Sequence, residues 1–201
     1  MDFDVLIIGG GVAGMQCALV LGSAKDKPFA QNKSIGLIAH QRSSHLKNAL
    51  FNNVLGLSPG TTGREILFEG IGHIKEQYNH VSLIEKEKVS RIKFLSDGFQ
   101  IRTNKNSYAS RIVVLALNYS KPFTIEGLDE FIIPHQKANP SKDRIQLKNS
   151  DHRIQDNLYC CGTIAGHRSQ FSIAAGSGAA VATDILTIWN AGSHTKVHDK
   201  I

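Results

Sequence analysis

The stretch Asp4-Val5-Leu6-Ile7-Ile8-Gly9-Gly10-Gly11-Val12-Ala13-Gly14 decides the fold of this chain. Its apolar run has no polar alternation, which is typical of a strand buried on both faces of a parallel sheet. The glycines that follow fit the pattern G-x-G-x-x-G, and residues 12–23 have the apolar spacing of a helix. A second apolar run, residues 34–39, completes a strand–helix–strand unit.

Each glycine of this pattern has a physical task. Gly9 permits a tight turn, Gly11 lets the backbone approach a pyrophosphate, and Gly14 lets the helix pack closely against the strand. The first residues of the helix, Val12 and Ala13, then offer free N–H groups and the positive end of the helix dipole to an anion. We therefore interpret the turn as a dinucleotide-binding site; the alternative is a tight turn that holds no ligand.

The rest of the chain predicts one α/β domain. Further helices and buried strands are expected at residues 62–78, 81–84, 111–117, 158–161 and 170–190. Residues 89–110 have the turns of a three-stranded antiparallel β-meander, whereas residues 118–157 are polar and irregular. We predict a single Rossmann-like domain over residues 1–190, with a central parallel sheet, helices and the meander, and a frayed tail over residues 191–201.

The composition is that of an ordinary globular protein, with 201 residues, 41% hydrophobic and 20% charged, and a net charge of +6. The apolar runs fall well short of the ~20 residues that span a bilayer, and the start of the chain lacks the basic residues of a signal peptide. Three cysteines give no disulfide framework, and the basic residues are scattered rather than grouped. We therefore expect a cytoplasmic protein that binds neither a membrane nor nucleic acid.

The end of the second strand lacks the acid that usually binds a ribose hydroxyl pair in this kind of site. Ala39 and His40 stand there, followed by Gln41, Arg42 and Ser43. A basic, hydroxyl-rich strand end suits a 2′-phosphate, which would mean that the glycine turn binds NADP. The alternative is a surface loop whose charges bind nothing.

Four pieces of the sequence match a known pattern. They are residues 4–14, the stretch from His45 to Leu55-Gly56-Leu57-Ser58-Pro59-Gly60, the meander followed by Ile112-Val113-Val114-Leu115-Ala116-Leu117-Asn118, and Leu158-Tyr159-Cys160-Cys161-Gly162-Thr163 followed by Ser169 to Gly178. Together they resemble the flavin domain of thioredoxin-reductase-like pyridine nucleotide-disulfide oxidoreductases over nearly the whole chain.

The resemblance implies that the cofactor is FAD. It places the N–H groups of Phe171 and Ser172, at a helix N-terminus, against the edge of the flavin ring. The cofactor-binding residues that we predict are Gly9, Gly11, Val12, Ala13, Gly14, His40, Gln41, Val89, Ala116, Leu117, Gly162, Thr163, Gln170, Phe171 and Ser172.

The sequence also departs from this family. Thr163 stands where the family has an aspartate that contacts the flavin's sugar-like chain, and Asn118 replaces the glycine of Ala-Thr-Gly. The family's separate nicotinamide domain would lie between the third and fourth pieces, where this chain has residues 118–157, which are too few for a domain. It has neither a second G-x-G-x-x-G nor a Cys-x-x-Cys. The chain is therefore not a complete thioredoxin reductase.

No side chain is identified as an acid, a base or a nucleophile. Cys160 and Cys161 are adjacent, and a disulfide between neighbours is strained, so we interpret them as buried thiols rather than a redox pair. His194 and His198 are interpreted as unligated, and no nucleophile elbow is present.

Two functions of different class stay open. The first is a flavoprotein of the oxidoreductase class, which transfers electrons through FAD and receives them from free NAD(P)H or from a partner protein. The second is a non-catalytic nucleotide-binding or regulatory module derived from such an enzyme. Because the nicotinamide domain is missing, we also expect an uncovered apolar surface over residues 117–131 and a homo-oligomer, for example a homodimer, or a tight partner there.

Overall fold

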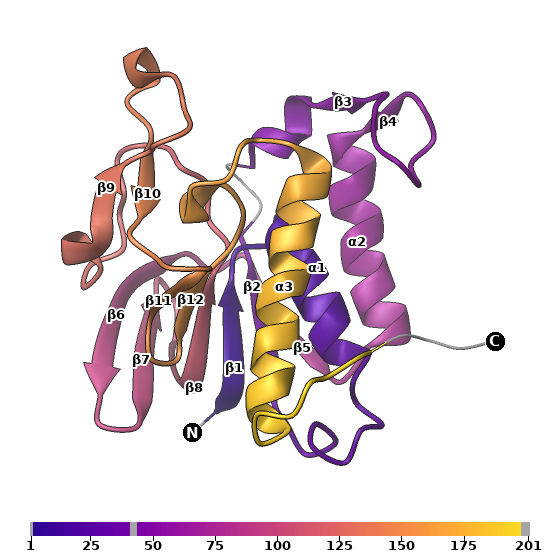
Figure 1. Ribbon diagram of the computed structural model, residues 1–201, viewed down its shortest axis with the longest axis vertical. Coiled ribbons are helices and arrows are strands. Elements are labelled where there is room, and N and C mark those ends of the chain that lie inside the picture. Colours follow the sequence, from indigo (N-terminus) through magenta and orange to yellow (C-terminus); the bar gives the residue numbers. More distant parts are fainter. Residues whose placement is uncertain (1, 41–43, 198–201) are drawn as a thin grey trace.

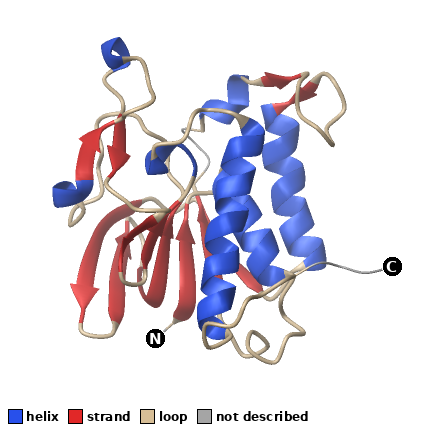
Figure 2. Cartoon of the chain, viewed as in Figure 1, coloured by secondary structure: helices blue, strands red, loops and turns tan. Residues whose placement is uncertain are grey.

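A central parallel sheet with helices on one face organises the protein (Figures 1 and 2). The computed structural model describes residues 2–40 and 44–197. The parallel strands lie in the order β12-β8-β1-β2-β5. Their bounds are β12 (Leu158–Cys160), β8 (Ser107–Leu115), β1 (Phe3–Ile8), β2 (Ile35–Ala39) and β5 (Val81–Glu85). The predicted α/β fold with a mostly parallel sheet is confirmed.

Alternation along β1 divides the core into two halves. Val5 and Ile7 face the helices, and Leu6 and Ile8 face the opposite side; all four side chains are buried. The first half is covered by α1 (Val12–Gly22), α2 (Gly63–Gln77) and α3 (Phe171–Trp189). Burial on both faces explains why β1 reads as an unbroken apolar run.

Small residues let α3 approach α1 closely. A Cβ atom on Gly178 would lie 2.0 Å from the carbonyl oxygen of Ala13. By length and composition α3 could also cross a membrane, but a core helix passes the same test, and its buried residues Val181 and Ile185 belong to the core beside α1. The run of small residues is thus explained by packing.

The meander differs from the prediction in one respect. β6 (Val89–Leu95), β7 (Gly98–Thr103) and β8 form it, but the third meander strand and the predicted strand 111–117 are one continuous strand. The first half of β8 pairs antiparallel with β7, and its second half pairs parallel with β12. β8 ends at Leu115, so Ala116 and Leu117 follow it at the carboxyl edge of the sheet.

The segment 118–157, expected to be irregular, contains short regular elements. They are η3 (Asp129–Phe131), β9 (Ile132–Pro134), η4 (Pro140–Lys142), β10 (Ile145–Leu147) and β11 (Arg153–Gln155). β9 and β10 pair antiparallel, and β11 pairs with β12. Three-residue strands are too short to carry a recognisable period, which is why the sequence did not reveal them.

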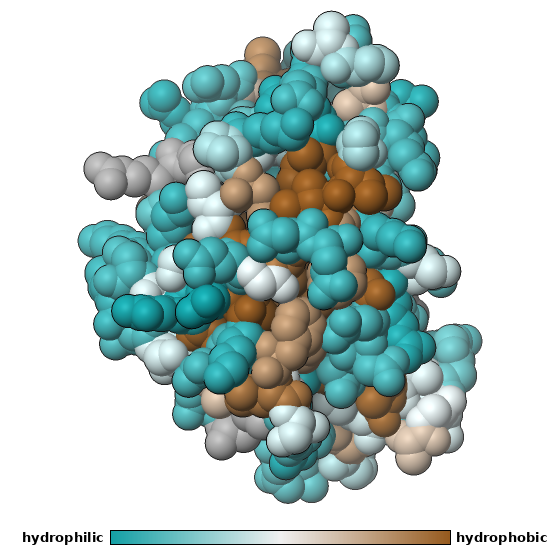
Figure 3. Space-filling view, turned by 90° about the vertical axis from the view of Figure 1, so that its left-hand side faces the viewer, coloured by the Kyte–Doolittle hydropathy of each residue, from teal (hydrophilic) through white to brown (hydrophobic). Residues whose placement is uncertain are grey.

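This segment also corrects the expected uncovered surface. Within residues 117–131, Ile125 and Leu128 are buried in the second half of the core, and Leu117, Phe123 and Phe131 pack against it. The segment 118–157 therefore covers the meander side of the sheet, so no second domain is needed to bury these residues. On that face, apolar residues show as separate patches among polar ones (Figure 3).

The remaining elements are short. η2 (His45–Asn48), β3 (Leu50–Phe51) and β4 (Thr61–Thr62) lead into α2, and η5 (Gly162–Ala165) precedes α3. In the described part of the predicted tail, Thr195 is buried and Val197 packs against the helix side of the core.

Candidate functional site

The glycine turn joins β1 to α1 at the carboxyl end of the sheet. Gly9 has φ +125°, and a Cβ atom there would lie 2.2 Å from the carbonyl oxygen of Ala116. On Gly14 a Cβ atom would lie 1.9 Å from the carbonyl oxygen of Gly9. On Gly11, by contrast, it would meet no atom within 4 Å. The first two positions require glycine for the fold, and Gly11 leaves open space.

A cavity of about 290 Å³ opens in front of this turn. Its walls come from the turn, from residues 44–51, from the end of β8, from η5 and from the start of α3. The strand order reverses direction at β1, with β2 on one side and β8 on the other. Ligands of open α/β sheets bind at such a switch point, outside the carboxyl ends of the strands.

A second cavity, of about 350 Å³, adjoins the first. Gly9, His40, Leu117 and Asn118 line both. The second cavity extends toward the start of the meander at Val89 and toward residues 120–125. The glycine turn thus stands between two hollows, an arrangement that suits an elongated ligand with a group at each end.

Two helices begin at the first cavity without a side-chain cap. The N-cap of α1 is Gly11, which has no side chain, and the Gln170 side chain at the N-cap of α3 accepts no hydrogen bond from the helix. α2 starts away from the glycine turn and has a complete capping box between Thr62 and Glu65. Uncapped N–H groups at a helix start need an acceptor, which an anionic ligand in the cavity would supply.

The structure brings most of the predicted site residues together. Those in the wall of the first cavity are Gly9, Gly11, Val12, Ala13, His40, Ala116, Leu117, Gly162, Thr163, Gln170 and Phe171. Val89 lines the second cavity. Gly14 lies behind the turn in the helix–strand contact, Ser172 follows the lining residue Phe171 in the first turn of α3, and Gln41 lies outside the described residues.

Sequence reasoning missed several lining residues. The first cavity is also lined from η2, β3 and their flanking residues, by Ser44, Leu46, Ala49 and Phe51. Tyr119, a few residues beyond β8, lines it as well. The rings of Phe51 and Phe171 pack edge to face, with centroids 5.5 Å apart. Only the resemblance to a loop-to-helix passage beside a flavin pointed to Leu46, Ala49 and Phe51, and no signal pointed to Ser44 or Tyr119.

Glu87 lines the second cavity but does not replace the missing acid. Its carboxylate accepts hydrogen bonds from Thr103 Oγ1 at 2.6 Å, from Asn106 Nδ2 at 2.7 Å and from the Tyr108 hydroxyl at 3.1 Å. Burial raises its pKa, but these donors outweigh burial and leave the pKa below its usual value. With its oxygens engaged in joining the meander strands, Glu87 has little capacity for a ribose hydroxyl pair.

The cysteines are buried free thiols, as the sequence predicted. Cys17, Cys160 and Cys161 have no exposed surface. Burial raises the pKa of all three, to about 12 for Cys161. A thiol that stays protonated at neutral pH is a poor nucleophile, so these residues are structural.

The chain shares its fold and sequence pattern with a known protein family. The model of the pyridine nucleotide-disulphide oxidoreductase family matches residues 3–166. The chain belongs to this family. No curated protein sequence matches the chain significantly.

Solved structures of thioredoxin reductases have the same fold as this chain. Thioredoxin reductase from T. acidophilum superposes with a TM-score of 0.66 at 14% identity, covering 94% of this chain and 98% of that one. A ferredoxin-flavin thioredoxin reductase from Clostridium acetobutylicum gives 0.68 at 18% identity, covering 94% and 98%. Thioredoxin reductase from Gloeobacter violaceus gives 0.70 at 13% identity, covering 100% and 98%. The resemblance seen in the sequence is therefore confirmed at the level of fold and family.

Proposed function

We propose that the chain binds FAD and acts as a flavoprotein of the oxidoreductase class. The observation that carries the proposal is the pair of cavities meeting at the glycine turn, since FAD has a flavin end and an adenosine end joined by a pyrophosphate. The open space at Gly11 and the uncapped start of α1 fit the pyrophosphate. Val89 in the second cavity fits the adenosine end.

The flavin end belongs in the first cavity. The start of α3 there presents its uncapped N–H groups, and the positive end of the helix dipole stabilises negative charge on a reduced flavin. Bound FAD would supply the electron chemistry, and the residues of this chain bind and orient it. The electrons would come from free NAD(P)H or from a partner protein. The proposed location is the cytoplasm, where free thiols such as those of this chain stay reduced.

The test is reconstitution with FAD, followed by absorption spectroscopy and a binding titration. We expect stoichiometric uptake by the wild type. The Gly11→Ala variant should fold equally well, because its Cβ meets no protein atom, but bind FAD at least about tenfold more weakly, since the methyl group occupies the space of the ligand.

Gly72→Ala is the matched control. Gly72 lies in α2, and a Cβ there also meets nothing within 4 Å, but it does not line either cavity. It should leave FAD affinity unchanged. Equal affinity of the wild type and Gly11→Ala would refute the assignment of the turn, and absence of uptake by the wild type would refute the proposed function.

A second candidate has support of its own. His40 and Lys88 line the second cavity, and the acid Glu87 is already engaged, so this cavity also suits the 2′-phosphate of NADP. Titration of the apoprotein with NADPH and with FAD distinguishes the two candidate cofactors. Titration with NADH shows whether the 2′-phosphate contributes to binding. Saturable binding of NADPH, with no uptake of FAD, would favour this alternative.

A non-catalytic module is the remaining alternative. It is distinguished by turnover: an FAD-loaded protein that neither oxidises NAD(P)H with a dye acceptor nor exchanges electrons with a chemical reductant would be a binding or regulatory module.

A further inference from the structure

Tyr119 supplies an aromatic side chain to the wall of the first cavity. It comes from the segment 118–157, not from the glycine turn or the start of α3. Of Tyr78, Tyr108, Tyr119 and Tyr159, only Tyr119 lines the first cavity; none of the four lines the second, and Trp189 lines neither. Its backbone carbonyl accepts a hydrogen bond from the N–H of Ile145 at 3.0 Å, which ties it to β10.

Two cross-strand neighbours hold the Tyr119 ring. His135 and Arg144 extend the β9–β10 ladder by one residue pair, and the N–H of His135 donates to the carbonyl of Arg144 at 2.9 Å. The guanidinium carbon of Arg144 lies 4.9 Å from the centre of the Tyr119 ring. The His135 ring meets it edge to face, with centroids 5.4 Å apart and planes at 65°. Both side chains therefore pack on Tyr119 from the same hairpin.

The buried polar groups of these neighbours give the ring a specific role. His135 Nδ1 accepts from the N–H of Lys137 at 3.1 Å, so the proton of the neutral ring is on Nε2. That Nε2 and Arg144 Nε are buried and have no hydrogen-bond partner among the described residues. An aromatic face attracts a guanidinium, so the Tyr119 ring partly compensates the buried Arg144 group that lies over it.

Ser120 adds a third support. Arg144 Nη1 donates to Ser120 Oγ at 2.6 Å, and Ser120 Oγ lies 3.3 Å from His45 Nε2. Because arginine can only donate, the serine hydroxyl is free to donate to His45 Nε2. His45 also lines the first cavity, with its ring centroid 6.1 Å from that of Tyr119. A network across three segments thus fixes this aromatic wall.

We propose that Tyr119, clamped by Arg144 and His135, is the residue that lies against the flavin ring of FAD in the first cavity. The inference rests on the proposed function. A rigid aromatic wall costs little conformational entropy on binding a flat ring, which is the physical benefit of the clamp. Tyr119 is then a cofactor-binding residue that the segment 118–157 contributes to the site, and Arg144 and His135 position it.

Flavin fluorescence tests this without reference to activity. Tyrosine in contact with an excited flavin quenches it, since one electron passes from the phenol to the flavin and then returns, whereas phenylalanine is much harder to oxidise. In FAD-loaded protein we expect weak emission from the wild type and a severalfold increase in Tyr119→Phe, which keeps the shape of the ring. Tyr159→Phe is the matched control, because Tyr159 is buried in the core outside both cavities.

A second variant tests the clamp. Arg144→Met keeps the apolar stem but removes the guanidinium, so the Tyr119 ring should become mobile, and the fluorescence decay should acquire a longer-lived component. Bound FAD with equal emission from the wild type and Tyr119→Phe would overturn this inference and leave the proposed function intact. A wild type that takes up no FAD would overturn both.

Discussion

Gly14 shows how one residue couples the fold to the site. The position lies inside α1, where alanine is normally more stable than glycine. Here a Cβ atom would lie 1.9 Å from the Gly9 carbonyl oxygen and 3.0 Å from the Ala116 Cβ. The helix can rest on the glycine turn only because this side chain is absent.

We therefore expect Gly14→Ala to destabilise the protein by about 1–3 kcal/mol through overpacking, and to displace the turn. Gly72→Ala, in open space on α2, should stabilise it by about 0.5–1 kcal/mol. Urea unfolding of both variants measures the difference. Equal effects of the two substitutions would contradict the packing argument.

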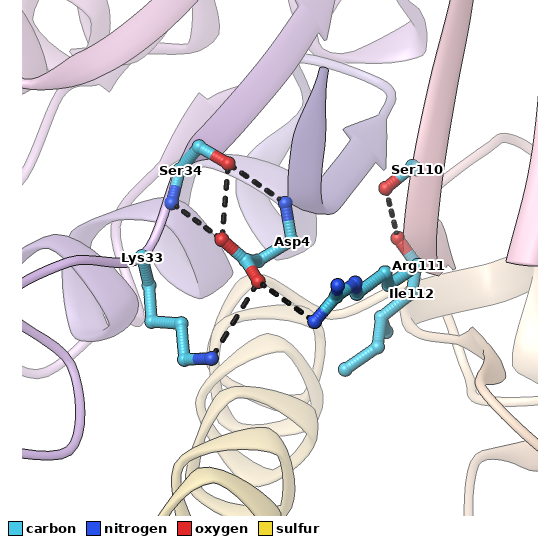
Figure 4. A network of polar contacts seen from close by, with 6 residues as sticks. All are labelled: Asp4, Lys33, Ser34, Ser110, Arg111 and Ile112. Carbon is cyan, nitrogen blue, oxygen red and sulfur yellow. Dashed lines mark hydrogen bonds and ion pairs between the residues drawn. The ribbon is translucent and has the colours of Figure 1, made fainter. Parts of the chain in front are cut away.

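Asp4 ties three strands together at the opposite edge of the sheet (Figure 4). Its carboxylate accepts from the N–H of Ser34 at 3.0 Å and from the Ser34 hydroxyl at 3.1 Å. Lys33 Nζ lies 3.5 Å away, and Arg111 Nη1, from β8, lies 4.0 Å away. Partial burial raises the pKa of Asp4, but the Ser34 hydrogen bonds and Lys33 outweigh it and lower the pKa below its ordinary value.

A lowered carboxylate pKa stabilises the folded state above the unfolded pKa of 3.8, and this stabilisation is lost as the pH falls through the folded value. Asp4→Asn should cost about 1–2 kcal/mol at pH 7 and much less at pH 3. Denaturant melts at the two pH values provide the check. A constant difference between wild type and variant would show that the charge is not involved.

At the scale of elements, a pair of histidines joins two loops: His167 lies between η5 and α3, and His152 lies in the turn before β11. His152 Nε2 and His167 Nε2 lie 2.9 Å apart, so one ring must donate and the other must accept. Burial lowers the pKa of His167, and the positive charges of His152, Lys137 and His135 lower it further. Asp151, with an oxygen 3.7 Å from His152 Nδ1, faces the same pair.

A histidine with a lowered folded pKa resists the proton that the unfolded chain takes up near pH 6.5. Stability should therefore fall as the pH drops below 6.5 toward the lower folded pKa of His167, and the fall should be smaller in His167→Asn. Because the loop that contains His167 leads to the start of α3, bound FAD should also be released more readily at low pH in the wild type. Identical pH profiles for the two proteins would exclude the pair as the cause.

At the scale of the whole molecule, the two sides of the sheet are covered differently. Helices cover one side, and the meander with the segment 118–157 covers the other (Figure 1). The large apolar side chains that stay exposed include Leu50, Leu55 and Phe68, near β3, β4 and α2, and not the segment where an uncovered surface was expected.

The homo-oligomer stays a prediction, and these residues are where it is best tested. Sedimentation equilibrium at high micromolar concentration should give a mass above the 22.0 kDa of one chain. Phe68→Ser should shift it toward the monomer, since the side chain is 83% exposed and its loss leaves the core intact. A wild type that is strictly monomeric would contradict the prediction.

The sequence by itself determined the strand–turn–helix unit, the buried strands of the sheet, the long helices and the family. These are local patterns: residues 4–14 encode a turn that needs glycine whatever surrounds it, and apolar spacing reports the faces that must be buried. For the same reason, the glycines of the turn could be named in advance as residues of the candidate site, and the family resemblance added the start of α3. Their positions follow from neighbours in the sequence.

The tertiary structure alone decided what the segment 118–157 does. Its three-residue strands form only by pairing with distant residues, and no period in the sequence reports such pairing. The clamp on Tyr119 needs Arg144 and His135 to meet across a hairpin, and the engagement of Glu87 needs donors from two other meander residues and their turn. Contacts between residues far apart in the chain depend on how the backbone closes in space, and that is where this site acquires its aromatic wall.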